Sequence, residues 1–374
     1  MKHGIRILAL FSVLCVFCLS ALSGCSDKTI GSIKGDSIVI NSITYLHDAF
    51  LEPADCDKDE RLGRVTDGKN LSYTVYSVKG REDTLLCETR SDAMVFVRQE
   101  KSVWKDPEIN TLSFDGKEMD YLRFGMRGAD ILAVLPPLLP RNTMSYADQL
   151  TAAFESLAKT YDIIIFDRIK AFPTGYTADA MANDTLKALH LLEIKACDLM
   201  GIAEGGLIAQ SMSVKYPGMF SSLILCSTAP SIGPDTRTIY AEWRSLAEQR
   251  NIPGMLDSYF FYTHSASWYE QNRDAFLAQA ESVTDQDCIN FIISIDGCAE
   301  YNIYDSLGSI RCPVFVLGAG DDKVFGVQGS HELMEKLRCK GFIYEGYGHG
   351  VYTEAPDYLS KVEQFMKEVR GPVE

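Results

Sequence analysis

The stretch Leu199-Met200-Gly201-Ile202-Ala203-Glu204-Gly205-Gly206 decides the fold of this chain. It follows an apolar run, CDLMGI, and leads into an amphipathic run, LIAQSMSVKYP. This order predicts a buried strand that turns sharply into a helix. Glycines before and after the tip of such a turn allow strand and helix to approach closely. The residue at the tip is Ala203.

Apolar strands and amphipathic helices alternate on both sides of this stretch, over residues 107–374. The expected strands read DILAVLP, YDIIIFD, CDLMGI, SSLILCS, PVFVLGAG and KGFIYEG. The expected helices lie around 146–159, 177–192, 205–216 and 330–337, with one more at the C-terminus. Continuous apolar strands between helices predict an α/β domain, a mostly parallel sheet with helices on both faces. Residues 228–306 interrupt the alternation with a helical, aromatic-rich insertion, which we interpret as a cap over the carboxyl edge of the sheet.

Three motifs in this region resemble the α/β-hydrolase fold family. The first is the turn at Gly201–Gly206, which in that family has the sequence G-x-S-x-G with the nucleophile at its tip. The second is GAGDDKV after the strand PVFVL, where Asp322 fits the position of the family's acid better than Asp321 does. The third is Gly348-His349-Gly350, followed by EAPDY, in the loop where the family places its histidine. The order of tip, acid and histidine is also that of the family.

The resemblance implies acyl transfer, the hydrolysis of an ester, thioester or amide, with no metal and no organic cofactor. His349 would take the nucleophile's proton while Asp322 orients the imidazole. The backbone N–H groups of Glu204 and Leu138 would form the oxyanion hole. The chain departs from the family where Pro136-Pro137 precede Leu138, because proline has no N–H and fixes φ.

The graver departure is Ala203 itself, because alanine has no lone pair with which to attack a carbonyl carbon. One interpretation is a pseudo-hydrolase that binds a small ester-like or apolar ligand without turning it over. A second is an active hydrolase with another nucleophile, such as Cys226, Ser227 or Glu204, or with Ala203 as a variant. A third is a surface scaffold or adhesion protein, in which an N-terminal module does the work.

The N-terminus predicts export. Lys2 and Arg6 precede an apolar stretch over residues 7–22, which is too short for a membrane span. The stretch ends Leu22-Ser23-Gly24-Cys25, which resembles the bacterial lipobox. That resemblance implies a signal peptide over 1–24 and lipidation of Cys25. The protein would then be anchored on the outer surface of the cell membrane or in the outer membrane. We expect a polar tether over 25–36 and a small β-rich module over 37–106.

The composition and the net charge exclude one further class of function. The 374 residues carry a formal net charge of −15 and lack the basic face of a nucleic-acid binder. Oligomeric state cannot be read from the sequence. Eight cysteines follow Cys25, and an exported chain can form disulfides, for which Cys56–Cys87 and Cys288–Cys298 are possible pairs. No cysteine or histidine cluster has the spacing of zinc ligands.

Overall fold

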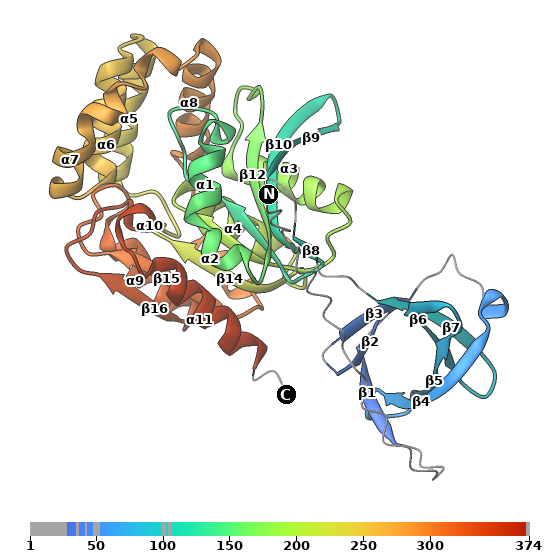
Figure 1. Cartoon of the computed structure of the whole chain (residues 1–374). Coiled ribbons are helices and arrows are strands. Elements are labelled where there is room, and N and C mark those ends of the chain that lie inside the picture. The colour runs from blue at the N-terminus through green and yellow to red at the C-terminus, as the bar shows by residue number, and fades with distance from the viewer. Residues whose placement is uncertain are drawn as a thin grey trace, which may run out of the picture. The chain divides into compact units, whose positions relative to one another are not determined.

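The computed structural model of the chain describes residues 28–34, 37–41, 43–47, 53–98, 102–103 and 107–371. They divide into two compact units, Met1–Gln99 and Glu100–Glu374 (Figure 1). The predicted signal peptide and the lipidation site Cys25 lie outside the described residues. Among the helices that are described, none combines the length and the apolar character that a membrane span requires.

The N-terminal unit is a small β-barrel. Its described strands are β1 (Thr29–Lys34), β2 (Ser37–Ile40), β3 (Ile43–His47), β4 (Lys58–Thr66), β5 (Ser72–Val78), β6 (Arg81–Glu88) and β7 (Ala93–Arg98). They pair in the order β1-β2-β3-β7-β6-β5-β4, and a parallel pairing of β1 with β4 closes the barrel. A short 3-10 helix, η1 (Pro53–Asp55), precedes β4. Ile38, Val65, Val75 and Leu85 belong to the apolar cluster of this unit.

The prediction of a tether over 25–36 is wrong for Thr29–Lys34, which form the strand β1. Its glycine permits close strand pairing rather than flexibility, since a Cβ on Gly31 would lie 2.0 Å from the carbonyl oxygen of Val39. The predicted boundary at residue 106 is also too late. Ser102–Val103 form β8, which pairs with the second unit.

The C-terminal unit is built on one large sheet. Besides β8, its strands are β9 (Glu108–Phe114), β10 (Lys117–Arg127), β11 (Ile131–Leu135), β12 (Asp162–Ile169), β13 (Cys197–Ile202), β14 (Phe220–Cys226), β15 (Val314–Ala319) and β16 (Lys340–Tyr344). The order is β16-β15-β14-β13-β11-β12-β10-β8, with β9 paired to β10. All pairings among β11 to β16 are parallel, and β10 is antiparallel to both β9 and β12.

Two apolar clusters cover the two faces of this sheet. Along β13, Leu199 belongs to one cluster and Met200 to the other, as the alternation of side chains in a strand requires. Helices α3 (Ala178–Leu191), α4 (Glu204–Lys215) and α9 (Gly326–Leu337) contribute to the first cluster. Helices α2 (Glu155–Ala158), α10 (Val351–Glu354) and α11 (Tyr358–Arg370) contribute to the second. The sheet is therefore buried on both sides, which explains its continuous apolar strands.

The helix expected around 146–159 is interrupted. The structure has the 3-10 helix η2 (Thr143–Tyr146), then α1 (Ala147–Ala153) and α2, which are separated at Phe154. Phe154 is buried in the second cluster.

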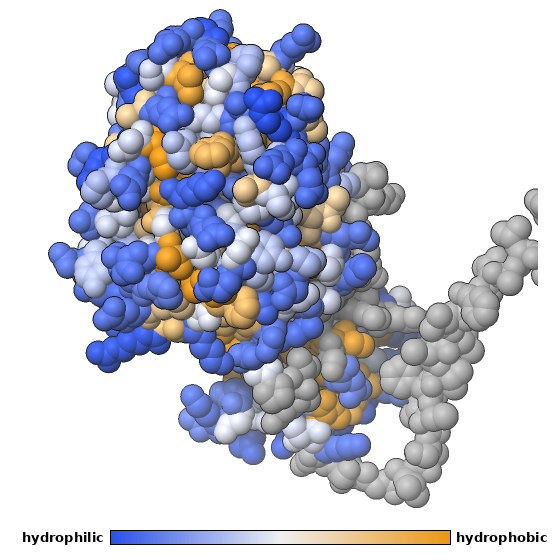
Figure 2. All heavy atoms as spheres, turned by 90° about the vertical axis from the view of Figure 1, so that its left-hand side faces the viewer, coloured by the Kyte–Doolittle hydropathy of each residue, from blue (hydrophilic) through white to orange (hydrophobic). Residues whose placement is uncertain are grey.

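Between β14 and β15 the chain forms a helical cap. Its elements are α5 (Pro234–Glu248), α6 (Ile252–Thr263), α7 (Ala266–Leu277), η3 (Ala280–Ser282), α8 (Asp285–Cys298) and η4 (Tyr304–Ser309). The face that carries these helices is mainly hydrophilic, with hydrophobic side chains in small groups (Figure 2). Trp243 is the aromatic centre of the cap, with ring centroids 5.1 Å from Tyr259 and 6.2 Å from Phe291.

The two disulfides suggested by the sequence are not formed. Every cysteine that the structure describes is a free thiol, and Cys56 and Cys87 are both buried. Cys288 and Cys298 both lie on α8. Ten residues of α-helix span about 15 Å, which is too far for a disulfide.

Candidate active site

Ala203 occupies the tip of a strained turn between β13 and α4. Its backbone has φ 51° and ψ −116°, a conformation that residues other than glycine adopt rarely. Two flanking glycines make the turn possible. A Cβ on Gly201 would lie 2.5 Å from the carbonyl oxygen of Gly205, and a Cβ on Gly205 would lie 2.1 Å from that of Leu135. The geometry is that of a nucleophile elbow.

Asp322 and His349 lie together as the sequence predicts. Nδ1 of His349 is 2.9 Å from Oδ2 and 3.0 Å from Oδ1 of Asp322, and both side chains are buried. Oδ1 of Asp322 also accepts hydrogen bonds from the backbone N–H groups of Val324, at 2.8 Å, and Phe325, at 3.0 Å. A carboxylate held in this way makes Nδ1 the protonated nitrogen and leaves Nε2 as the base.

Ala203, Glu204, Leu138 and His349 line one small cavity under the cap. Its volume is about 10 Å³, which is room for about one water molecule. The remaining walls are mainly aromatic and aliphatic and include Pro137, Tyr240, Trp243, Tyr259, Thr263, Val324 and Phe325. Four of the five residues that the sequence assigns to the chemistry thus line one cavity, and the fifth, Asp322, contacts it through His349.

The two expected oxyanion donors have N–H groups that the fold leaves available. Glu204 is the first residue of α4, where an N–H has no acceptor within the helix. Among the described hydrogen bonds, none uses the N–H of Leu138. Two bonds hold the proline-containing loop, since Pro136 accepts from Arg168 at 2.8 Å and the carbonyl of Leu138 accepts from the Tyr259 hydroxyl at 2.6 Å.

Two of the three alternative nucleophiles, Cys226 and Ser227, are not at the cavity, and the carboxylate of the third, Glu204, is paired with Arg168. Neither Cys226 nor Ser227 is among its lining residues, and both are fully buried. Burial raises the pKa of the Cys226 thiol to about 12, so the thiol remains protonated at neutral pH. The hydroxyl of Thr263, which does line the cavity, donates to the backbone carbonyl of Tyr259 at 2.7 Å.

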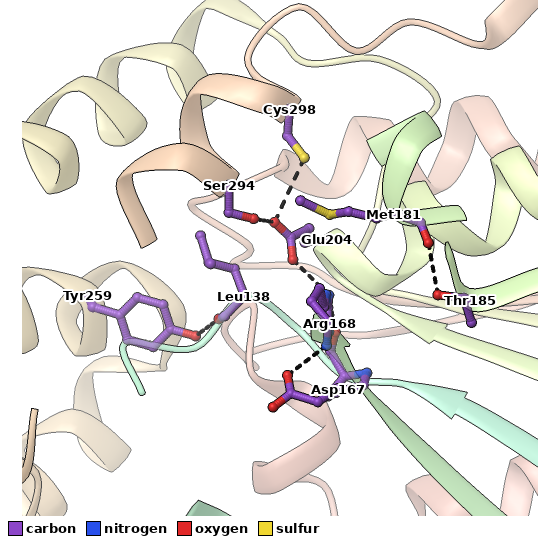
Figure 3. A network of polar contacts seen from close by, with 10 residues as sticks. Leu138, Asp167, Arg168, Met181, Thr185, Glu204, Tyr259, Ser294 and Cys298 are labelled. Carbon is purple, nitrogen blue, oxygen red and sulfur yellow. Dashed lines mark hydrogen bonds and ion pairs between the residues drawn. The ribbon is translucent and has the colours of Figure 1, made fainter. Parts of the chain in front are cut away.

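The carboxylate of Glu204 belongs to a buried network that the sequence analysis missed (Figure 3). Oε2 lies 2.7 Å from the guanidinium of Arg168, which comes from the end of β12. Oε1 accepts from the hydroxyl of Ser294 and lies 3.7 Å from the sulfur of Cys298, both on α8 of the cap. Arg168 therefore compensates the negative charge of Glu204 beside the oxyanion site.

The sequence analysis also missed a set of hydrogen bonds that join the cap to the loop of His349. The N–H of Gly350 donates to the carbonyl of Thr263 at 2.5 Å. The N–H of Ser265 donates to Glu354 at 2.9 Å and its hydroxyl to the same carboxylate at 2.5 Å. His264 lies between these contacts, stacked on Trp268 with ring centroids 3.9 Å apart. Burial, with a smaller contribution from His349, lowers the pKa of His264 to about 3, so the imidazole is neutral.

Comparison with known proteins agrees with this geometry. A family model described as "Serine aminopeptidase, S33" matches residues 177–356. A protein of Pantoea ananatis named "Putative carbamate hydrolase RutD" is 22% identical over 216 residues, 55% of this chain and 78% of that protein. A protein of the same name from Rhizobium rhizogenes is 26% identical over 223 residues, 57% of this chain and 85% of that protein.

Solved structures show the same fold at low identity. MGS-M2, an α/β hydrolase enzyme from a Medee basin deep-sea metagenome library, superposes with a TM-score of 0.61 at 18% identity, covering 68% of this chain and 95% of that one. The enol-lactonase from Burkholderia xenovorans LB400 has a TM-score of 0.58 at 20% identity, covering 69% of this chain and 99% of that one. The C-terminal unit of this chain therefore has the α/β-hydrolase fold.

Proposed function

We propose that this protein is a catalytically impaired α/β-hydrolase that binds a small acyl compound beneath its cap. The observation that carries the proposal is Ala203 in the strained backbone conformation of a nucleophile elbow. The strain costs on the order of 1–3 kcal/mol. Without a serine it has no catalytic purpose, so the turn is best explained as inherited from a serine hydrolase.

The size of the expected impairment follows from the chemistry. Removal of the nucleophile from a Ser-His-Asp site lowers kcat by about a million-fold. Among the described residues that line the cavity there is no serine, cysteine or aspartate that could substitute for it. What remains is a site that can orient a carbonyl group at the N–H groups of Glu204 and Leu138.

The ligand class rests on the cavity walls and on the relatives. Tyr240, Trp243 and Phe325 give the cavity an apolar lining, which favours an ester-like or apolar group over an ion. The relatives are named for carbamate hydrolysis and lactone hydrolysis. Esters, lactones and carbamates share an acyl carbon and a carbonyl oxygen, which is the chemistry that an oxyanion hole recognises. We therefore expect a small uncharged acyl compound.

We also propose that the chain acts at a membrane surface, anchored by a lipid on Cys25. The support is the sequence Leu22-Ser23-Gly24-Cys25 after the apolar stretch 7–22. Cys25→Ala should move the protein from the membrane fraction to the soluble fraction. If the variant remains in the membrane fraction, the anchor is elsewhere.

The test of the impaired site is to supply the missing oxygen. We expect Ala203→Ser to hydrolyse short 4-nitrophenyl esters and to react with a fluorophosphonate probe. The natural protein should do neither above background. The control is Ala203→Ser/His349→Gln, which carries the hydroxyl but lacks the base. Turnover by the natural protein comparable with that of Ala203→Ser would overturn the proposal. An inert Ala203→Ser variant that is folded would show that the site is not a disarmed hydrolase.

A further inference from the structure

A second cavity lies directly beside the elbow, between the end of β12, the loop 137–143 and helix α8 of the cap. Its volume is about 40 Å³. It shares Pro137, Leu138 and Glu204 with the elbow cavity, so the two spaces are neighbours. Its other walls are largely polar and include Arg141, Asn142, Thr143, Asp167, Arg168, Asn290 and Ser294.

Two arginines in the pocket walls carry hydrogen-bond donors that have no partner among the described residues. Arg168 is 7% exposed, and its terminal nitrogen is already bonded to Glu204 and to the carbonyl of Pro136. Its Nε is buried and has no partner among the described residues. The buried Nε of Arg141 likewise lacks a partner within the described part of the chain, and its guanidinium carbon lies 5.4 Å from the ring centroid of Tyr146. Buried donors of this kind are rare in folded proteins, because each loses its hydration without replacement.

Asp167 brings an acceptor to the same pocket. Its Oδ2 accepts from the amide of Asn142 at 2.6 Å, and its Oδ1 accepts from the backbone N–H of Arg168 at 2.8 Å. The Thr143 side chain is a further hydrogen-bond partner of this carboxylate. A carboxylate offers about four lone-pair positions, so one position remains. The pocket therefore presents both donors and an acceptor.

The balance of charge decides which ligand fits. Arg168 is compensated by Glu204 within the network described above. The charge of Arg141 is matched in the pocket walls by Asp167, and Asp287 adds a further carboxylate. Because no positive charge is left over, an anionic ligand would be opposed by these carboxylates. A neutral group with a carbonyl oxygen and an N–H fits both the arginine donors and the aspartate acceptor.

We propose that this pocket is a subsite for a neutral amide-type group, such as a carboxamide or ureido group, on the ligand of the elbow cavity. The carbonyl oxygen accepts from guanidinium N–H groups of the two arginines and the N–H donates to Asp167. This assignment rests on the proposed function, because it makes the subsite part of the same ligand. It narrows the ligand class from a small acyl compound to one that also carries an amide.

The test compares three probes of nearly equal size: propionamide, propionate and 2-butanone. Their binding to the full-length protein at neutral pH is measured by ligand-observed NMR titration. We expect propionamide to bind about tenfold more tightly than either of the other two, because only propionamide satisfies donors and acceptor together. Arg141→Met should remove this preference, while the matched control Arg244→Met, at an exposed ion pair on α5, should keep it.

Asp167→Asn gives a sharper readout, because it removes a negative charge and adds a donor. Propionamide binding should weaken in this variant and propionate binding should strengthen, so that the order of the two is reversed. Arg141→Lys serves in place of Arg141→Met if the latter does not fold. The subsite is disproved if propionate binds the natural protein as well as propionamide, if no probe binds, or if neither variant changes the order. These outcomes are independent of Ala203→Ser esterase activity, so each proposal can fail alone.

Discussion

The Nδ1 atom of His349 lies 2.9 Å from Oδ2 of Asp322, although the residue that this pair would serve is Ala203. The pair has a structural reason to persist. Oδ1 of Asp322 accepts the N–H groups of Val324 and Phe325 and so holds the loop that leads into α9. Loss of the carboxylate would leave buried N–H groups without acceptors, at about 1–3 kcal/mol each.

The same contact predicts how a restored site would behave. In the Ala203→Ser background, Asp322→Asn should lower kcat by about 10⁴-fold, because an amide no longer holds the required tautomer of His349. The matched control is Asp321→Asn, one residue earlier and exposed, which should change kcat by less than about twofold. Steady-state kinetics with a 4-nitrophenyl ester measures both. Equal effects of the two substitutions on kcat would show that Asp322 is not the acid that orients His349.

The buried pair of Arg168 and Glu204 predicts a strong asymmetry between single and double substitutions. Arg168→Met should lower the free energy of unfolding by about 3–5 kcal/mol, because it leaves a carboxylate buried without a counter-charge. Arg168→Met/Glu204→Gln should recover more than half of that loss. Arg244→Met, at a surface pair with Asp296, should lose no more than about 1 kcal/mol. Urea unfolding followed by circular dichroism measures all three, and additive losses in the double variant would contradict the pairing.

The elbow glycines predict a backbone effect that involves no chemistry. Gly205→Ala should lower the free energy of unfolding by more than about 3 kcal/mol, because the added Cβ would lie 2.1 Å from the carbonyl oxygen of Leu135. Gly218→Ala is the control, since a Cβ there meets no atom within 4 Å. It should change stability by less than about 0.5 kcal/mol. Similar midpoints of thermal unfolding for the two variants would show that the turn can open to accept a side chain.

Local pattern was sufficient for much of the fold and for the centre of the site. The glycine-flanked turn at Ala203 and the loops that carry Asp322 and His349 each follow a short apolar strand. Because these strands are parallel, the order of elements along the chain brings the three residues to one edge of the sheet. The partners of Glu204 are different. Arg168 is 36 residues away in sequence and Ser294 is 90 residues away in the cap. No short-range sequence pattern indicates such contacts, because they depend on how the cap packs against the sheet domain. The strand β1 was missed for a related reason. Gly31 indicates a flexible linker in the sequence, and only its pairing with β2 shows that it belongs to a strand.

Asp167 makes the stability of the protein depend on pH. Burial is the main cause that raises the pKa of this carboxyl from 3.8 to about 6, against the opposing effect of Arg168. The folded protein therefore holds the proton more tightly than the unfolded chain does. The resulting stabilisation, about 3 kcal/mol, is complete below about pH 4 and is lost as the pH rises through about 6.

When the pH falls from about 8 to about 5, this group alone should add about 1 kcal/mol to the free energy of unfolding. Asp167→Asn should lack that increment, whereas Asp148→Asn, at an exposed position on α1, should retain it. Urea unfolding of the three proteins at the two pH values gives the comparison, and an equal pH dependence in Asp167→Asn and the natural protein would show that the carboxyl is ionised throughout.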